Sequence, residues 1–119
     1  IAIGKKLGVD VIPDPELALM QGYMIEATYD TGFSTAPGFA GVKAQSSLDY
    51  RYFNEDVGYG LVFLRNLGEQ IGVATPVMSA VITLVSLLMN RDYVGEARRT
   101  METLGLSQRT AQDLENLLA

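Results

Sequence analysis

The feature that most constrains the fold is an apolar run over residues 77–89, directly preceded by Thr75 and Pro76. A threonine followed by proline is a typical helix start, because proline fits the first helical position. The run is shorter than the ~18 apolar residues that a membrane-spanning helix needs. A helix that is apolar on every side is expected in a protein core. We therefore predict a buried central helix, Pro76–Met89, around which the rest of the chain packs.

Small polar residues recur at helical spacing within and just after this run and form one narrow stripe: Ser79, Thr83, Ser86 and Asn90. One hypothesis is that the stripe permits close helix packing, with each hydroxyl bonded to its own backbone. The other hypothesis is that the stripe lines a polar pocket. Both interpretations are compatible with the sequence pattern.

The other helices are predicted from apolar periodicity and from end signals. The first is expected over residues 1–7 and ends at Gly8, and the second over residues 14–27, where it begins at Asp14 and tolerates Gly22. The third is expected over residues 54–71, from Asn54 to an end at Gly72. A short helix over residues 94–104 or 96–104 is expected to end at Gly105, and the last helix is expected to begin at Ser107. The predicted buried faces are Leu17, Met20, Met24 and Ala27 in the second helix and Val57, Leu61, Leu64, Leu67 and Ile71 in the third. Five or six helices with almost no strand predict an all-α domain.

Composition excludes several classes of function. The 119 residues suffice for one domain with a core, so residues 1–119 are expected to form a single helical domain. The net charge of −5, without a basic cluster, argues against binding to nucleic acid or to an anionic membrane. The chain has no cysteine and no histidine, which removes the thiolate ligands, the commonest metal ligand and the commonest general base. No metal site is predicted, and no Gly-x-Gly-x-x-Gly loop follows a strand to bind a cofactor.

The start of the chain and its least regular stretch, residues 31–49, lead to further expectations. The chain begins with Ile1 inside a helix-like pattern, so we expect it to be the C-terminal piece of a longer protein. No signal-peptide pattern is present, and a cytoplasmic location is expected. Residues 31–49 lack a steady period and are rich in glycine, serine and threonine. A loop of this length is either mobile or functional, and the functional hypothesis is a cover over the stretch that follows.

That stretch begins at Arg51 and continues into Asn54, Glu55 and Asp56. Asn54 is a typical helix cap, and the helix dipole favours ionised acids in the first turn. One hypothesis is an ordinary helix start with a surface ion pair. The other is a site in which Arg51 binds a substrate carboxylate beside Asp56, which orients a catalytic base. Because the two lie five residues apart, they share neither an α-helical face nor a strand face, and they converge only if the chain turns between them.

Two further features lie near this stretch or after it. Gly58 and Gly60 either weaken the first turns of the helix or leave room for a ligand or a partner backbone. The pair Arg98 and Arg99 is expected on a solvated helix face.

The stretch resembles the signature of the octopine/nopaline (opine) dehydrogenase family, in the helical C-terminal domain. The matching residues are Arg51-Tyr52, Glu55-Asp56-Val57 and Gly60-Leu61, followed by Leu67-Gly68, Gly72-Val73-Ala74-Thr75-Pro76, Asp92-Tyr93 and Thr103-Leu104-Gly105-Leu106. These matches keep their order and spacing over about half of the chain, residues 48–106. Two positions depart from the signature: Tyr50 stands where the family often has histidine, and Gly58 stands where it usually has proline.

The resemblance implies a helical second domain that packs against an N-terminal Rossmann domain and often carries subunit contacts. Enzymes of the family reduce the imine formed between an amino acid and a 2-oxo acid, with NADH or NADPH bound mainly by the Rossmann domain. The resemblance further implies that Asp56 pairs with a histidine located upstream of this chain and that Arg51 holds a substrate carboxylate. We therefore expect a substrate-binding and dimerisation domain of such an oxidoreductase, inactive as an isolated fragment and without a bound cofactor of its own.

Two other functions fit the same residues. The second hypothesis is a non-catalytic helical interaction or dimerisation domain, which would explain the apolar helices without any catalytic role. The third hypothesis is the helical domain of another NAD(P)-dependent reductase. The sequence encoded upstream of Ile1 separates them, because a Gly-rich nucleotide-binding unit and a histidine there support the dehydrogenase.

Overall fold

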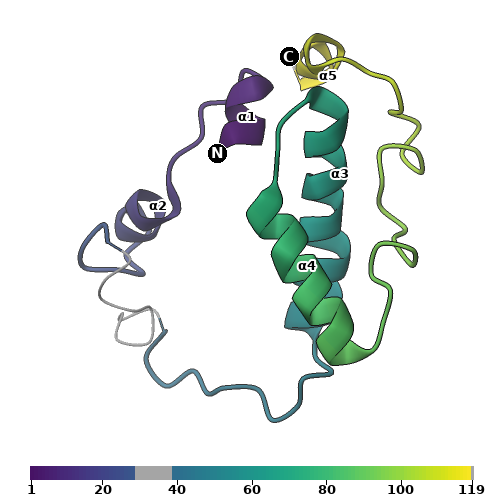
Figure 1. Cartoon of the computed structure of the whole chain (residues 1–119). Coiled ribbons are helices and arrows are strands. Elements are labelled where there is room, and N and C mark those ends of the chain that lie inside the picture. The colour runs from purple at the N-terminus through teal and green to yellow at the C-terminus, as the bar shows by residue number, and fades with distance from the viewer. Residues whose placement is uncertain (29–38, 119) are drawn as a thin grey trace. The chain divides into compact units, whose positions relative to one another are not determined.

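The computed structural model describes residues 1–28 and 39–118, and this part of the chain is helical without strands (Figure 1). Its elements are α1 (Ala2–Lys6), α2 (Asp14–Met20), the π-helix η3 (Tyr52–Leu61), α3 (Val62–Ile71), α4 (Pro76–Met89) and α5 (Ala111–Leu118). The predicted all-α architecture is confirmed. Within the same ranges, no helix is both long enough and apolar enough to cross a bilayer.

The chain divides into two compact units, one made of Ile1 and Asp10–Gln45 and the other of Ala2–Val9 and Ser46–Ala119. The single domain expected from the sequence stays a prediction. Residues 31–38 of the predicted covering loop, residues 31–49, lie outside the described part of the chain, and its covering role stays a prediction.

In the first unit, the predicted 14–27 helix is wrong in length, and of its predicted buried face Met24 is buried whereas Leu17, Met20 and Ala27 are exposed. Helix α2 ends at Met20, and Gly22 adopts a left-handed conformation with φ of 76°. The backbone N–H of Tyr23 donates to the carbonyl of Ala18 at 2.9 Å and closes the helix end. Gly22 is therefore a helix terminator, because glycine takes a positive φ at little cost. Ala18 and Met24 form the small core, and Leu17 and Met20 are exposed.

In the second unit, helix α3 is the element on which two clusters of apolar side chains meet. One cluster joins α1, α3, α5 and the chain between α4 and α5: Ile3, Leu7, Leu67, Ile71, Met101 and Leu114. The other joins η3, α4 and the chain after α4 to the first residue of α3: Val57, Val62, Ile82, Val85 and Tyr93. Both clusters are assembled from segments that are distant in the sequence.

The expectation that α4 is buried on every side is wrong for the described chain. Only Ile82 and Val85 are buried in it, whereas Leu84 and Leu87 remain 67% and 74% exposed. The elements that pack on α4 are η3 and α3, and together they cover one face. The hypothesis that hydroxyls of the polar stripe bond to their own backbone is confirmed for two residues, since Ser79 donates to the carbonyl of Thr75 at 3.1 Å and Thr83 to that of Ser79 at 2.9 Å.

The predicted helix over residues 94–104 is absent, and turns take its place. Side chains in this region form hydrogen bonds to nearby backbone groups, and these bonds compete with the backbone hydrogen bonds of a helix. Asp92 accepts from the N–H of Gly95 at 2.9 Å, and the hydroxyls of Thr100 and Thr103 each accept the other's backbone N–H. Gly105 has the predicted left-handed conformation, with φ of 69°.

The start of the last helix was also placed wrongly at Ser107. Thr110 and Asp113 form a reciprocal cap of α5, in which the N–H of Asp113 donates to the hydroxyl of Thr110 and the N–H of Thr110 donates to the Asp113 carboxylate at 2.8 Å. The hydrogen bonds from Thr110 lower the pKa of Asp113. The Asp113 carboxylate is thus ionised where the helix dipole favours it.

Candidate functional site

The helix that carries Arg51 and Asp56 begins earlier than expected. Arg51 already has helical backbone angles and precedes η3, and the N–H groups of Phe53 and Asn54 donate to the carbonyl of Tyr50 at 3.2 and 3.1 Å. Asn54 is therefore inside the helix, and its predicted role as the cap is wrong. The cause lies in its side chain, which is engaged elsewhere.

The amide of Asn54 joins three other residues. Its oxygen accepts from the Arg91 guanidinium at 2.7 Å and from the Tyr93 hydroxyl at 2.8 Å. Its nitrogen donates to the Asp49 carboxylate at 2.8 Å. The bonds to Arg91 and Tyr93 hold the start of η3 against the chain that follows α4, and both segments belong to the second unit.

Tyr93 is the buried centre of this contact, with 3% of its surface exposed. A methyl group added at Gly58 would lie 3.1 Å from the Tyr93 ring. The space that Gly58 leaves is thus filled by a side chain of the same unit. Neither of the two hypotheses for Gly58, a weak first turn or room for a ligand or partner backbone, describes this packing.

Arg91 completes the contact from the solvent side. Its guanidinium lies 4.8 Å from the centre of the Tyr93 ring and forms a two-bond ion pair with Glu96. The hydrogen bonds from Arg91 lower the pKa of Glu96, and the bonded carboxylate raises the pKa of Arg91. Arg91 is therefore held in place by an acid, an amide and an aromatic ring.

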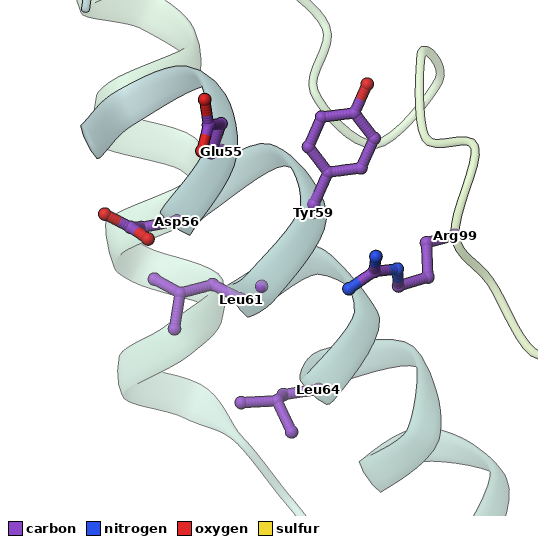
Figure 2. Close-up of a pocket in the computed structure, with 7 residues that line it drawn as sticks. Glu55, Asp56, Tyr59, Leu61, Leu64 and Arg99 are labelled. Atoms are coloured by element: carbon purple, nitrogen blue, oxygen red, sulfur yellow. The ribbon is translucent and has the colours of Figure 1, made fainter. Parts of the chain in front are cut away.

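An open hollow of about 630 Å³ lies on the outer side of η3 (Figure 2). Its lining comes from η3, the start of α3 and the turn region after α4: Glu55, Asp56, Tyr59, Gly60, Leu61, Leu64 and Arg99. Figure 2 shows the two carboxylates on one side and Tyr59 with Arg99 on the other. Gly60, unlike Gly58, contributes an open wall, because an added methyl group would meet only the Glu55 carbonyl oxygen at 3.9 Å.

Of the two predicted site residues, Asp56 lines this hollow and Arg51 does not. The Arg51 guanidinium is instead 3.7 Å from the Glu55 carboxylate, and both side chains are more than half exposed. Glu55 therefore links Arg51 to the rim of the hollow. The convergence of Arg51 and Asp56 on one cleft stays a prediction.

The π-helical winding changes the spacing argument for this pair. In a π-helix residue i bonds to residue i+5, so residues five apart lie one turn above the other. The N–H of Val62 donates in this way to the carbonyl of Val57. Arg51 precedes the first π-helical residue and Asp56 lies inside the π-helix, which brings a five-residue spacing close to one face.

Sequence reasoning missed three residues of this region: Tyr59, Arg91 and Arg99. Arg99 lies 5.9 Å from the centre of the Tyr59 ring, although the two are 40 positions apart in the sequence. No local pattern connects residues at that distance. The consecutive residues Asp92 and Tyr93 were recognised as a sequence motif. This motif was the available signal for the contact between Tyr93 and Asn54.

The described residues do not form a site for a metal or a dinucleotide. No group of three acidic side chains within them is placed to hold a metal ion. A dinucleotide site of the usual kind needs a glycine-rich turn between a strand and a helix, and the described ranges contain no strand.

The described chain is helical and carries a charged, solvent-accessible hollow lined by η3, the start of α3 and the turn region after α4. Residues 1–89 match the family model described as the alpha-helical domain of NAD/NADP octopine/nopaline dehydrogenases. The chain therefore belongs to this family, as its resemblance to the signature predicted.

Curated relatives agree with this assignment. The chain is similar to an opine dehydrogenase of Arthrobacter sp. (strain 1C), with 42% identity over 80 residues, which are 67% of this chain and 22% of the relative. It is also similar to the protein ocs of Agrobacterium tumefaciens (strain Ach5), with 29% identity over 86 residues, which are 72% of this chain and 24% of the relative. The matched region thus spans less than a quarter of the length of each of these relatives.

Proposed function

We propose that the chain is the substrate-binding and dimerisation domain of an opine-dehydrogenase-like oxidoreductase that joins an amino acid to a 2-oxo acid with NAD(P)H. The observation that carries this proposal is the family match over residues 1–89, which includes Arg51 and Asp56. In this proposal the nucleotide is bound mainly by an N-terminal Rossmann domain outside the chain, and it supplies the hydride when bound. A cytoplasmic location belongs to the same proposal.

Arg51 is proposed to hold the carboxylate of the 2-oxo acid. Its present partner, Glu55, is 3.7 Å away, and both groups are open to water. Exposed ion pairs of this kind contribute about 0–1 kcal/mol, so a ligand can replace the contact at little cost. A guanidinium binds a carboxylate through two parallel hydrogen bonds, which fix the orientation of the ligand as well as its position.

Asp56 is proposed to orient a histidine that the rest of the enzyme supplies. Its carboxylate is exposed at the hollow and forms no ion pair with the described residues. An ionised carboxylate beside an imidazole holds the ring in one tautomer and stabilises its protonated form. Asp56 is a positioning residue in this scheme, while the imidazole transfers the proton.

The exposed face of α4 favours the dimerisation part of the proposal and also favours the alternative of a purely structural interaction domain. Val77, Leu84, Leu87 and Leu88 are each more than half exposed on this helix. Large exposed apolar patches tend to be interfaces, and symmetric dimers are the commonest assemblies. Catalysis therefore has to be tested separately from association.

The test is the Asp56→Asn variant of the full-length protein, assayed with a 2-oxo acid, an amine substrate and NAD(P)H. We expect kcat to fall ~10²–10⁴-fold, the usual contribution of acid–base catalysis, while cofactor binding and the melting temperature stay unchanged. Glu69→Gln is the matched control, because Glu69 is an exposed acid that pairs with Arg65 on the next helix. Turnover of the Asp56 variant equal to that of the wild type would contradict the proposed role.

Arg51→Lys tests the second role. Lysine keeps the charge but loses the planar fork, so the KM for the 2-oxo acid is expected to rise with a smaller change in kcat. A change in kcat alone would argue against carboxylate binding. If the wild-type protein forms dimers but catalyses no reductive condensation, the interaction domain replaces the enzyme as the explanation.

A further inference from the structure

The hollow on η3 contains opposite charges that do not pair with each other. Glu55 and Asp56 lie on one wall, and Arg99 reaches toward the hollow from the turn region after α4 (Figure 2). The ion pairs among the described residues are Arg51 with Glu55, Arg65 with Glu69 and Arg91 with Glu96. Neither Asp56 nor Arg99 belongs to any of them, so each charge faces an open volume of about 630 Å³.

Arg99 lies beside an aromatic side chain. Its guanidinium lies 5.9 Å from the centre of the Tyr59 ring, a distance at which a cation is attracted to the ring face. Leu61 and Leu64 are half-buried and lie on the side of Asp56 in Figure 2, and Gly60 adds no side chain to the wall. The hollow therefore presents a cation, two anions and an apolar surface together.

This combination is complementary to an α-amino acid. A free amino acid carries a carboxylate and an ammonium group on one carbon and a side chain beside them. A carboxylate is best bound by a guanidinium, and an ammonium group by carboxylates. Tyr59, Leu61 and Leu64 offer contact to an apolar side chain.

We propose that the hollow is the subsite for the amino-acid substrate and that Arg99 binds the α-carboxylate of that substrate. The proposal rests on the proposed function and extends it, because the reaction joins two molecules that each carry a carboxylate. Arg51 is assigned to the 2-oxo acid, and a second cation is needed for the amino acid. Arg99 is the arginine among the residues that line the hollow, and it forms no ion pair with the described residues.

The proposal is tested in the full-length protein with matched probes. L-Leucine and isopentylamine differ only by the carboxylate, and pyruvate serves as the 2-oxo acid with NAD(P)H. The variants are Arg99→Gln and the control Arg98→Gln, which removes a neighbouring exposed arginine that does not line the hollow. We expect Arg99→Gln to raise the KM for L-leucine about tenfold, the loss of one charge-assisted contact that is open to water.

The same variant is expected to leave the KM for isopentylamine, the KM for pyruvate and the melting temperature unchanged. Equal increases for L-leucine and isopentylamine would overturn the proposal, because they would make Arg99 a structural support without a carboxylate contact. An unchanged KM for L-leucine would overturn it too, and so would an equal increase in Arg98→Gln. Arg99→Lys should restore part of the affinity.

A binding measurement without turnover distinguishes failure of the proposed function from failure of the amino-acid subsite. Titration calorimetry of the wild type and of Arg99→Gln is carried out with L-leucine, L-methionine, L-glutamate and L-arginine. Amino-acid binding that Arg99→Gln weakens supports the subsite even if no reductive condensation occurs. Turnover that Arg99→Gln leaves unaffected retains the function and rejects the subsite, and a wild type that binds none of the four amino acids at millimolar concentration rejects the subsite as well.

Discussion

The elements η3 and α3 form one continuous helix whose two halves bury different numbers of side chains. In α3, Leu67 and Ile71 are buried in the core and Gly68 lies against the chain that leads into α4. In η3, Val57 is the one buried side chain, and the amide of Asn54 ties the helix to Arg91 and Tyr93. The half with more buried residues, α3, carries no residue of the candidate site apart from Leu64, whereas η3, with one buried side chain, carries both acids.

The difference indicates that the smaller number of buried side chains leaves more of the surface of η3 for functional groups. A helix that is fixed by burying one broad apolar face has few positions left for functional groups. A helix fixed at a few points by hydrogen bonds keeps most of its side chains exposed, at the expense of stability, because each net hydrogen bond contributes only ~0.5–1.5 kcal/mol. The predictions that follow compare the two halves.

The largest effect is expected from Leu67→Ala in α3. Removing a buried leucine side chain typically costs ~2–5 kcal/mol, because it loses apolar contact and leaves a cavity. Urea unfolding should show the loss as a lower midpoint at an unchanged slope. A loss below ~1 kcal/mol would mean that the cluster around α1, α3 and α5 is less tightly packed than its burial indicates.

The second effect contrasts Gly68 in α3 with Gly60 in η3. A methyl group at Gly68 would lie 2.8 Å from the Val73 carbonyl oxygen and 2.9 Å from a methyl carbon of Thr75, so Gly68→Ala should destabilise by ~1–3 kcal/mol. At Gly60 the space is open, and Gly60→Ala should be neutral or stabilising by up to ~1 kcal/mol. Thermal melts of both variants measure the contrast, and equal losses would refute it.

The third effect concerns the polar attachment of η3. Asn54→Ala removes the acceptor of the Tyr93 hydroxyl and of Arg91 and should cost ~1–2 kcal/mol, the lower part of the range for such losses, since water reaches Arg91. A double-mutant cycle with Tyr93→Phe should give a coupling energy of ~0.5 kcal/mol or more. Additive losses would show that the two groups do not act as a unit.

The smallest effect is a pH dependence of the ion pair that supports this attachment. Arg91 lowers the pKa of Glu96 in the folded protein, so the stabilisation is present above the pKa of the unfolded chain, ordinarily 4.5. It is lost as the pH falls through the lower, folded value. Glu96→Gln should therefore flatten the decrease in stability below about pH 4.5, measured by urea unfolding at several pH values, with Glu102→Gln as the exposed control. A curve unchanged by Glu96→Gln would contradict the contribution of the pair.

Much of the fold followed from local signals. The all-α class, the end of α3 at Gly72 and the extent of α4 were predicted correctly, because glycine, proline and apolar periodicity act within a few residues. The predicted helix at residues 94–104 failed because threonine and aspartate side chains compete for the backbone there. The periodicity of apolar residues carries no information about that competition for backbone hydrogen bonds.

The candidate site was predicted only in part for a different physical reason. Asp56 was found through its motif, and the structure places it at the hollow. Arg99 was assigned to a solvated face, and its position beside Tyr59 depends on how the chain returns after α4. The burial of α4 was overestimated because composition shows that a helix is apolar but does not show how many neighbours cover it.

The π-helical winding of η3 has a consequence for how this segment tolerates changes in length. Successive residues of an α-helix are rotated by about 100° around its axis, so one residue more or fewer turns everything beyond it by that angle. A π turn accommodates an additional residue in a single turn and keeps the helix axis continuous on both sides. A one-residue deletion between Arg51 and Asp56 is therefore expected to rewind the segment as an α-helix of four-residue spacing rather than to break it. The segment is thus expected to remain helical after the loss of one residue, but the angle about the helix axis between Arg51 and Asp56 would change.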